Sequence, residues 1–407
     1  MTPQPEWKRN LLWLWIVSAV TQFGVYSAQP FTPLFIQREL GVHDPHQISL
    51  WVGLSGSAIG VSLIVSSPFW GRIADRFGRK SMAVRATGLG GLFVAALAFV
   101  QTPMQLVVVR FLSGSVTGNQ AAMAALVGSE TPNSEVGRAY GLIGSSVAVG
   151  RSIGPLLGGL LVVRIGLRYQ FALAGLLMCA AVVPLIFRVR ETSRRNEPHR
   201  KLSLRQLVTL VPRDNLRMAA LLVMVQGAAN IVNFTSAQFL GVKIIESASG
   251  SAGFYTGLTF TAAGICTAAG ALAYSFVASR FGYRAVAAAT TVLLGAGVAA
   301  IAIETQPSLI VLAAAGTGLA FGACIPALNS MIGLESPEPL RATIFGIGTA
   351  LFGVLLATVP TLAGLLASAT DVSRMLLVIS VGAVAGGSAL LLFGREPIPL
   401  GDPVAQA

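Results

Sequence analysis

Charged side chains are scarce in this sequence. Asp, Glu, Lys and Arg make up 11% of its 407 residues, about half the share of a typical soluble domain. Hydrophobic residues reach 54%, and the mean hydropathy is +0.73. A water-soluble chain of this length would need much more surface charge, so we infer that lipid surrounds most of the protein.

Cysteine and histidine are also rare, with three residues of each. The cysteines lie inside apolar runs, at spacings that indicate neither a disulfide framework nor a metal site. The histidines fall in connecting segments, and neither a nucleophile–base pair nor a phosphate-binding Walker loop is evident. The sequence therefore argues against an enzyme, a metal site and a bound cofactor.

Long apolar runs are the main feature that the sequence does have. A membrane-spanning helix needs about 20 mostly apolar residues, and only helices or closed barrels satisfy their backbone groups in lipid. Twelve such runs follow one another, at residues 11–35, 48–70, 82–101, 104–128, 138–163, 168–188, 216–240, 252–277, 284–304, 307–332, 341–366 and 373–394. We therefore predict an all-α integral membrane protein with 12 transmembrane helices.

Basic residues are distributed unevenly around these runs. Of the 28 Lys and Arg residues, five lie in one set of connections, 21 lie in the other set and the termini, and Arg110 and Arg151 fall inside runs. Because Lys and Arg collect in cytoplasmic loops, both termini are predicted to be cytoplasmic, in a plasma membrane of the bacterial inner-membrane type. The net charge of +12 is explained in the same way, without a nucleic-acid partner.

Short segments recur in the same order along the chain. Ser-Ala-Gln at 27–29 recurs at 236–238, Phe-Gly at 77–78 recurs at 281–282, the glycines at 114 and 118 recur at 318 and 322, and Gly-x-Glu-x-Pro at 128–132 recurs at 333–337. The offsets are nearly constant, from 204 to 209 residues. We predict two parallel six-helix halves, 1–188 and 216–407, joined by a basic cytoplasmic linker, 189–215. Transporters built from such halves bind a small-molecule substrate between them and open to each side in turn.

The connection after the second run concentrates charge, with five charged residues between 71 and 80 (GRIADRFGRK). Gly71 allows helices to approach closely, Gly78 favours a turn, and Asp75 can cap a helix or pair with an arginine. A simple cytoplasmic anchor needs only basic residues, so we interpret the loop as a conformational gate and keep the anchor as the alternative. The predicted gate consists of Gly71, Asp75, Arg76, Gly78, Arg79 and Lys80.

These residues carry a resemblance to a known family. The pattern Gly71-x-x-x-Asp75-Arg76-x-Gly78-Arg79-Lys80 resembles the signature loop of the major facilitator superfamily. The fifth run resembles the motif of the drug–proton antiporter branch of that family, at Gly150-x-x-x-Gly154-Pro155-x-x-Gly158-Gly159. A third motif of that branch is similar to Arg110 with Gly114 and Gly118. The resemblance covers all twelve runs and implies the major facilitator fold and multidrug efflux.

The resemblance also implies a role for the charged loop. In this family the loop carboxylate and a following arginine join a carboxylate at the end of the fourth span, in a latch that favours the outward-open state. The matching positions are Asp75, Arg79 and Glu130. The second half has Ser279 in place of the loop carboxylate, so the latch is expected in the first half alone.

The glycines of the fifth run also have a physical interpretation. Gly150, Gly154 and Gly158 are spaced four residues apart and share one helix face, where they permit close packing, while Pro155 bends the span. A role in substrate exchange and ordinary helix packing both remain open.

Polar residues inside the predicted spans are candidates for the substrate or proton pathway. Charge in the membrane is costly, so Arg110 and Arg151 need a cavity, a polar partner or a ligand. Uncharged candidates, each equally able to bond a neighbouring helix, are Gln22, Tyr26, Asn119, Gln120, Gln226, Asn230, Asn233 and Asn329. No Asp or Glu lies in the middle of a run. This weakens the prediction of proton coupling, and Glu130 or Asp75 would have to titrate instead.

We expect a secondary-active transporter that exports hydrophobic small molecules by alternating access, with protons as the coupling ion, working as a monomer in the bilayer. The alternative is a selective transporter of an organic anion or metabolite, with Arg110 and Arg151 binding its charge. A membrane enzyme or receptor is a third class, and the lack of a catalytic cluster disfavours it.

Overall fold

The protein is almost entirely helical in the computed structural model, which describes residues 6–116, 118–132, 135–191, 213–248, 251–336 and 338–396. Eleven helices within these ranges are long and apolar enough to cross a membrane. The fourth predicted span is instead split into two short helices, α5 (Pro103–Ser115) and α6 (Asn119–Glu130). Gly118 lies at the break with a φ of 124°, a conformation that favours glycine. The predicted all-α membrane fold is confirmed.

The remaining helices follow the order of the predicted spans. The first half also contains α1 (Glu6–Ala28), η1 (Gln29–Phe31), α2 (Thr32–Arg38), α3 (Pro45–Phe77), α4 (Arg79–Ala96), η2 (Leu97–Phe99), α7 (Val136–Ile165), α8 (Leu167–Ala180) and α9 (Val182–Phe187). The second half contains α11 (Arg213–Ala248), α12 (Ala252–Phe281), α13 (Tyr283–Ile303), α14 (Pro307–Glu335), α15 (Glu338–Ala369) and α16 (Val372–Phe393). Most of the predicted linker lies outside the described residues, so the boundaries of the halves stay a prediction.

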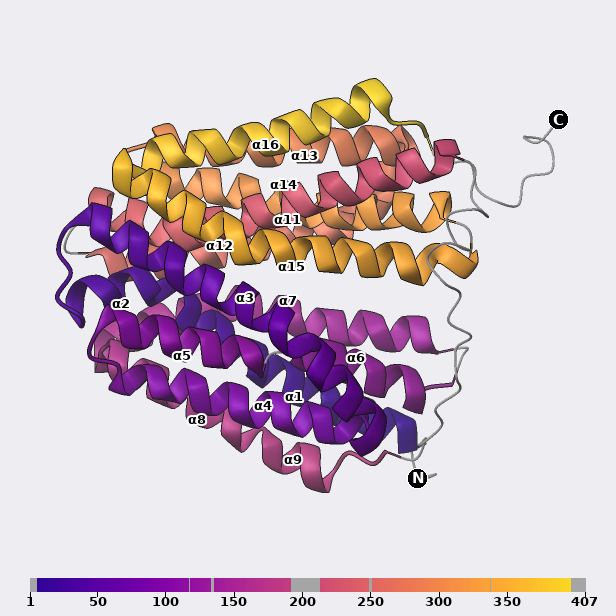
Figure 1. Ribbon diagram of the computed structural model, residues 1–407, viewed down its shortest axis with the longest axis horizontal. Coiled ribbons are helices and arrows are strands. Elements are labelled where there is room, and N and C mark those ends of the chain that lie inside the picture. The colour runs from indigo at the N-terminus through magenta and orange to yellow at the C-terminus, as the bar shows by residue number, and fades with distance from the viewer. Residues whose placement is uncertain are drawn as a thin grey trace.

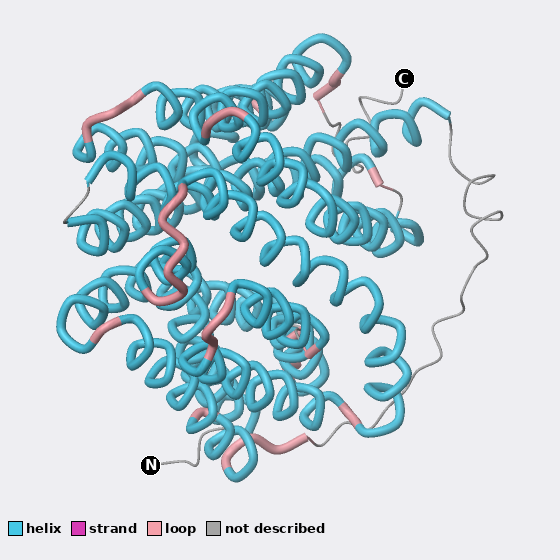
Figure 2. The backbone as a smooth tube through the Cα atoms, turned by 60° about the vertical axis from the view of Figure 1, so that its left-hand side comes forward, coloured by secondary structure: helices cyan, strands magenta, loops and turns pink. Residues whose placement is uncertain are grey.

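The helices form two bundles that meet at one end and diverge toward the other (Figures 1 and 2). They meet at the closed end, where α2 is followed by α3 and α15 by α16. They diverge at the open end, where α1 begins and α16 ends. One apolar core, which includes Phe31, Phe239 and Met375, runs through both halves toward the closed end. Toward the open end each half has a separate core, around Met123 in the first and Met331 in the second.

Glycines make the contact between the halves unusually close. A Cβ atom on Gly60 of α3 would overlap the backbone of α15 at Leu356 and Ala357. Gly159 of α7 faces Gly257 of α12, where a Cβ atom would be crowded, at 3.2 Å from the Gly257 Cα atom. The Ser57 hydroxyl of α3 also accepts a hydrogen bond from the backbone N–H of Thr361, at 2.9 Å. Small residues therefore allow the two helix pairs to pack backbone against backbone.

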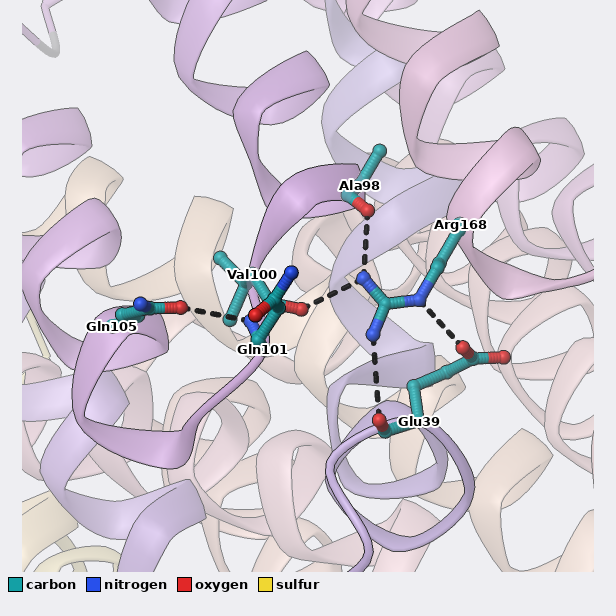
Figure 3. A network of polar contacts seen from close by, with 6 residues as sticks. All are labelled: Glu39, Ala98, Val100, Gln101, Gln105 and Arg168. Atoms are coloured by element: carbon teal, nitrogen blue, oxygen red, sulfur yellow. Dashed lines mark hydrogen bonds and ion pairs between the residues drawn. The ribbon is translucent and has the colours of Figure 1, made fainter.

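Arg168, at the start of α8, connects neighbouring helices of the first half at the closed end by hydrogen bonds (Figure 3). Its Nε donates to the Glu39 carboxylate at 2.7 Å, and its Nη1 donates to the carbonyls of Ala98 and Val100 at 2.8 and 2.7 Å. Its Nη2 donates to the Glu39 carbonyl at 3.3 Å. One guanidinium thus joins the ends of three predicted spans, and the carboxylate of Glu39 balances its charge.

The glycine contacts predict opposite effects of the same substitution at two positions. Gly60→Ala places a methyl group against the α15 backbone and is expected to lower stability by about 1–3 kcal/mol. Gly316→Ala on α14, where a Cβ meets nothing within 4 Å, is expected to leave stability unchanged or raise it by up to about 1 kcal/mol. Thermal unfolding of both purified variants measures the difference. Equal melting temperatures would contradict the close contact at Gly60.

Candidate functional site

A small pocket inside the membrane region brings both halves of the chain together. Its polar lining consists of Gln29, Thr32, Ser55, Arg110 and Gln238. The first four belong to the first half, whereas Gln238 lies on α11 of the second half. Gln29 and Gln238 are the last residues of the two Ser-Ala-Gln copies, so the internal repeat places an amide side chain on each side of the pocket.

Arg110 projects from α5 into this pocket. Its Nη2 donates to the Thr32 hydroxyl at 2.6 Å, and that hydroxyl donates in turn to the Gln29 carbonyl at 2.9 Å. This is the one hydrogen bond that the guanidinium makes within the described part of the chain, although a guanidinium has five N–H donors. Among the described residues that line the pocket there is no carboxylate. Arg110 thus brings a positive charge with most of its donors unused.

Gln238 closes the pocket from the second half. Its Oε1 is buried and accepts no hydrogen bond within the described residues. Its side chain lies directly over Gly56 of α3, where a Cβ atom would overlap the amide group. Gly56 is therefore the feature of α3 that lets this amide reach the pocket.

Arg151 lies elsewhere in the structure and does not line the pocket. Its guanidinium carbon is 5.8 Å from the centre of the Tyr26 ring on α1 and 5.3 Å from that of Phe321 on α14. A cation above an aromatic face is attracted to it, most strongly where water is excluded. Arg151 therefore contacts aromatic residues of both halves, and the structure does not bring the two predicted arginines to one site.

The predicted glycine motif of α7 packs against α1. Cβ atoms on Gly150, Gly154 and Gly158 would overlap or crowd α1, in the segment from Gln22 to Ser27. These three glycines share one helix face, as their spacing predicts, whereas Gly159 faces the second half. The motif therefore joins α7 to both neighbours at once, and its role in exchange stays a prediction.

Several uncharged candidates are satisfied by the protein itself. The Gln226 amide donates to Asn329 Oδ1 at 2.6 Å, and the Asn230 amide donates to the Gln226 carbonyl at 2.9 Å. Only the backbone carbonyl of Asn233 accepts a hydrogen bond, from Ser236, so the role of its side chain stays a prediction. The side chains of Asn119 and Gln120 lie outside the described residues. Gln226 and Asn329 thus form a hydrogen bond between helices α11 and α14.

The predicted gate is described in part. The backbone N–H groups of Arg79 and Lys80 donate to the two carboxylate oxygens of Glu191, at 2.9 and 3.1 Å, and Gly78 has a φ of 84°. The Arg79 guanidinium donates to the Ala125 carbonyl of α6 at 3.0 Å. The side chains at 71, 75 and 76 lie outside the described residues, so the latch between Asp75, Arg79 and Glu130 stays a prediction.

The second half repeats the arrangement in which the Glu191 carboxylate caps the N-terminus of α4. The N–H groups of Tyr283 and Arg284 donate to the Glu396 carboxylate, beside Gly282, whose φ is 84°. Each carboxylate satisfies free amides at a helix N-terminus, where negative charge is favoured. We did not expect Glu191 and Glu396 from the sequence, although their offset of 205 residues lies within the range of the repeat.

Two basic residues that the charge count assigned to connections lie inside helices. Arg85 stacks on Trp70, with its guanidinium carbon 3.6 Å from the ring centre. The buried Lys243 of α11 donates to the Ala302 carbonyl at 3.1 Å and to the Ser373 hydroxyl at 2.6 Å. The count was wrong for these two residues, because Arg85 falls within the predicted run 82–101 and α11 continues past Lys243 to Ala248. An apolar helix accepts a cation where a ring or carbonyl partner is at hand.

Comparison with known proteins identifies the class. The family model of the Major Facilitator Superfamily matches residues 14–254 and 229–406, and the chain belongs to this family of membrane transporters. It is 27% identical over 343 residues to the multidrug resistance protein MdtG of Escherichia fergusonii, covering 84% of this chain and 83% of that protein. It is 33% identical to MdtG of Proteus mirabilis over 183 residues, which is 45% of each chain.

A solved structure agrees in fold. The nucleoside transporter NupG (D323A mutant) superimposes with a TM-score of 0.79 over 95% of this chain and 100% of that chain, at 14% sequence identity. At this identity the likeness concerns the fold alone. The family model confirms the predicted family, and the solved structure confirms the helical architecture.

The cap on α4 generates a prediction about stability. Glu191→Ala leaves the amides of residues 79 and 80 without acceptors and is expected to lower stability by about 1–2 kcal/mol. Glu135→Ala is the matched control, because Glu135 precedes α7 without a side-chain cap hydrogen bond. Thermal unfolding of the purified proteins measures both changes. A loss at Glu191 no larger than that at Glu135 would contradict the capping role.

Proposed function

We propose that this protein is a proton-driven exporter of hydrophobic small molecules that works by alternating access. The relatives named as multidrug resistance proteins support the substrate class, because one of them aligns over 84% of this chain. The observation that carries the mechanism is the unequal contact between the halves. They share one core at the closed end and have separate cores toward the open end, as expected for one of two alternating states.

The orientation follows from the positive-inside rule. We propose a plasma-membrane location of the bacterial inner-membrane type with both termini in the cytoplasm, and the protein functions there as a monomer. The closed end then faces outward and the open end faces the cytoplasm. A compound from the cytoplasm or the inner leaflet would enter between the bundles, and opening of the contacts around Gly60 and Gly159 would release it outside.

Proton coupling needs a group that titrates during the cycle. Asp75 and Glu130 are the candidates, because an arginine stays protonated at physiological pH. Exchange of protons at the cytoplasmic end would change the charge of the loop at 71–80 and with it the preference for one state. The contacts of Arg151 would change when the halves rearrange, because it contacts an aromatic residue of each half.

Retention of a lipophilic cationic dye in cells tests this function. Cells that express the wild type are expected to retain less dye, and a protonophore is expected to remove the difference. Asp75→Asn and Arg151→Ala are expected to lose export at equal expression. Arg374→Ala, which removes an exposed ion pair with Asp371, is the control and is expected to export the dye like the wild type. Dye retention equal to that of cells without the protein would contradict export of hydrophobic cations.

A further inference from the structure

The charge of Arg110 is not balanced by the residues around it. Arg168 provides the comparison, since it makes four hydrogen bonds and pairs with the Glu39 carboxylate (Figure 3). Arg110 makes one, to Thr32, within the described chain. A charge inside the membrane region is costly unless a partner compensates it. Among the described residues, the pocket thus lacks an acceptor that carries negative charge.

The other groups of the pocket also suit a negatively charged acceptor. Gln29 and Gln238 have amide N–H donors on opposite halves, whereas the Ser55 hydroxyl already donates to the Val52 carbonyl at 2.9 Å. Gln238 has no donor for its buried Oε1 in the described structure, and a half-turn of the amide would present its NH₂ group instead. The remaining lining, Val52 and Ile59, is apolar. The site therefore combines one cation, several neutral donors and an apolar wall.

We propose that this pocket binds the carboxylate of an amphipathic substrate with an apolar body. Arg110 receives the carboxylate through its unused N–H groups, with the Gln29 and Gln238 amides on either side. Arg110 and Gln238 belong to different halves, so the bound carboxylate joins the halves next to the closed end. The proposal rests on the proposed export function, and adds compounds with one carboxylate to the hydrophobic molecules that the exporter accepts.

Two fluorescent probes with the same pyrene body separate the effect of ligand charge on binding affinity from the effect of ligand size. Pyrenebutyric acid has a carboxylate, and its primary amide replaces that group with a neutral one of similar shape. Fluorescence anisotropy with purified protein in lipid nanodiscs gives the affinity of each probe. The wild type is expected to bind the acid at least about tenfold more tightly than the amide, because charged hydrogen bonds are the stronger ones.

Substitutions in the pocket test the assignment to these residues. Gln238→Glu places a carboxylate beside Arg110 and is expected to remove the preference for the acid without weakening binding of the amide. Arg110→Gln is expected to remove the same preference. Gln29→Glu is a second variant with the same expected result, for use if Gln238→Glu unfolds at a lower temperature. Gln105→Glu, an exposed change on the same helix α5, is the matched control and is expected to keep the preference.

Equal affinity of the wild type for acid and amide would overturn the proposal, as would a preference that survives both Gln238→Glu and Arg110→Gln. Cellular export of the lipophilic cationic dye separates this result from the proposed function. If the dye is exported but the purified protein does not prefer the acid, export stands and the carboxylate site is wrong. If the protein prefers the acid but cells export neither the acid nor the dye, the site stands and the export function is wrong.

Discussion

A single constraint governs this structure: a polar group inside the membrane region must find its partner within the protein. The backbone meets it by forming helices. Arg168 meets it through Glu39 and two carbonyls, Lys243 through the Ala302 carbonyl and a serine, and Gln226 through Asn329. Arg110 and Arg85 meet it only in part: the described neighbours of Arg110 leave most of its donors unused, and Nε and Nη1 of Arg85 are buried without a hydrogen-bond partner among the described residues. At Arg110, which lines a pocket with Gln238 of the second half, the proposed carboxylate would complete the site.

Close packing of small residues gives the molecule its two-part design. Glycines bring α3 against α15 and α7 against α12 with backbone in contact, so the halves touch firmly from Gly53 to Gly60 of α3 and from Ser152 to Gly159 of α7. Backbone contact of this kind depends on shape, and small residues can separate without exposing a large side chain. The pocket is lined by Arg110 of the first half and Gln238 of the second, so the proposed carboxylate would link occupancy of the pocket to the position of the halves.

Much of the fold follows from the sequence, because length and hydropathy define the spans and one repeat defines the halves. The face formed by Gly150, Gly154 and Gly158 was also predictable, since helical spacing fixes it. The pocket was not, because the repeat shows that Gln29 and Gln238 are related by symmetry but not that they meet. Lys243 was placed wrongly for a similar reason, as its partners lie on distant segments. The break at Gly118 depends on a local backbone conformation that composition does not reveal.

The central claim is that the closed end must open for transport. A disulfide between Ser57→Cys on α3 and Thr361→Cys on α15, in a chain whose three native cysteines are replaced by serine, tests it directly. The two positions already share a hydrogen bond of 2.9 Å. The account predicts that oxidation stops export and that a reducing agent restores it, while each single-cysteine variant stays active. Export at the full rate with the disulfide formed would contradict the account.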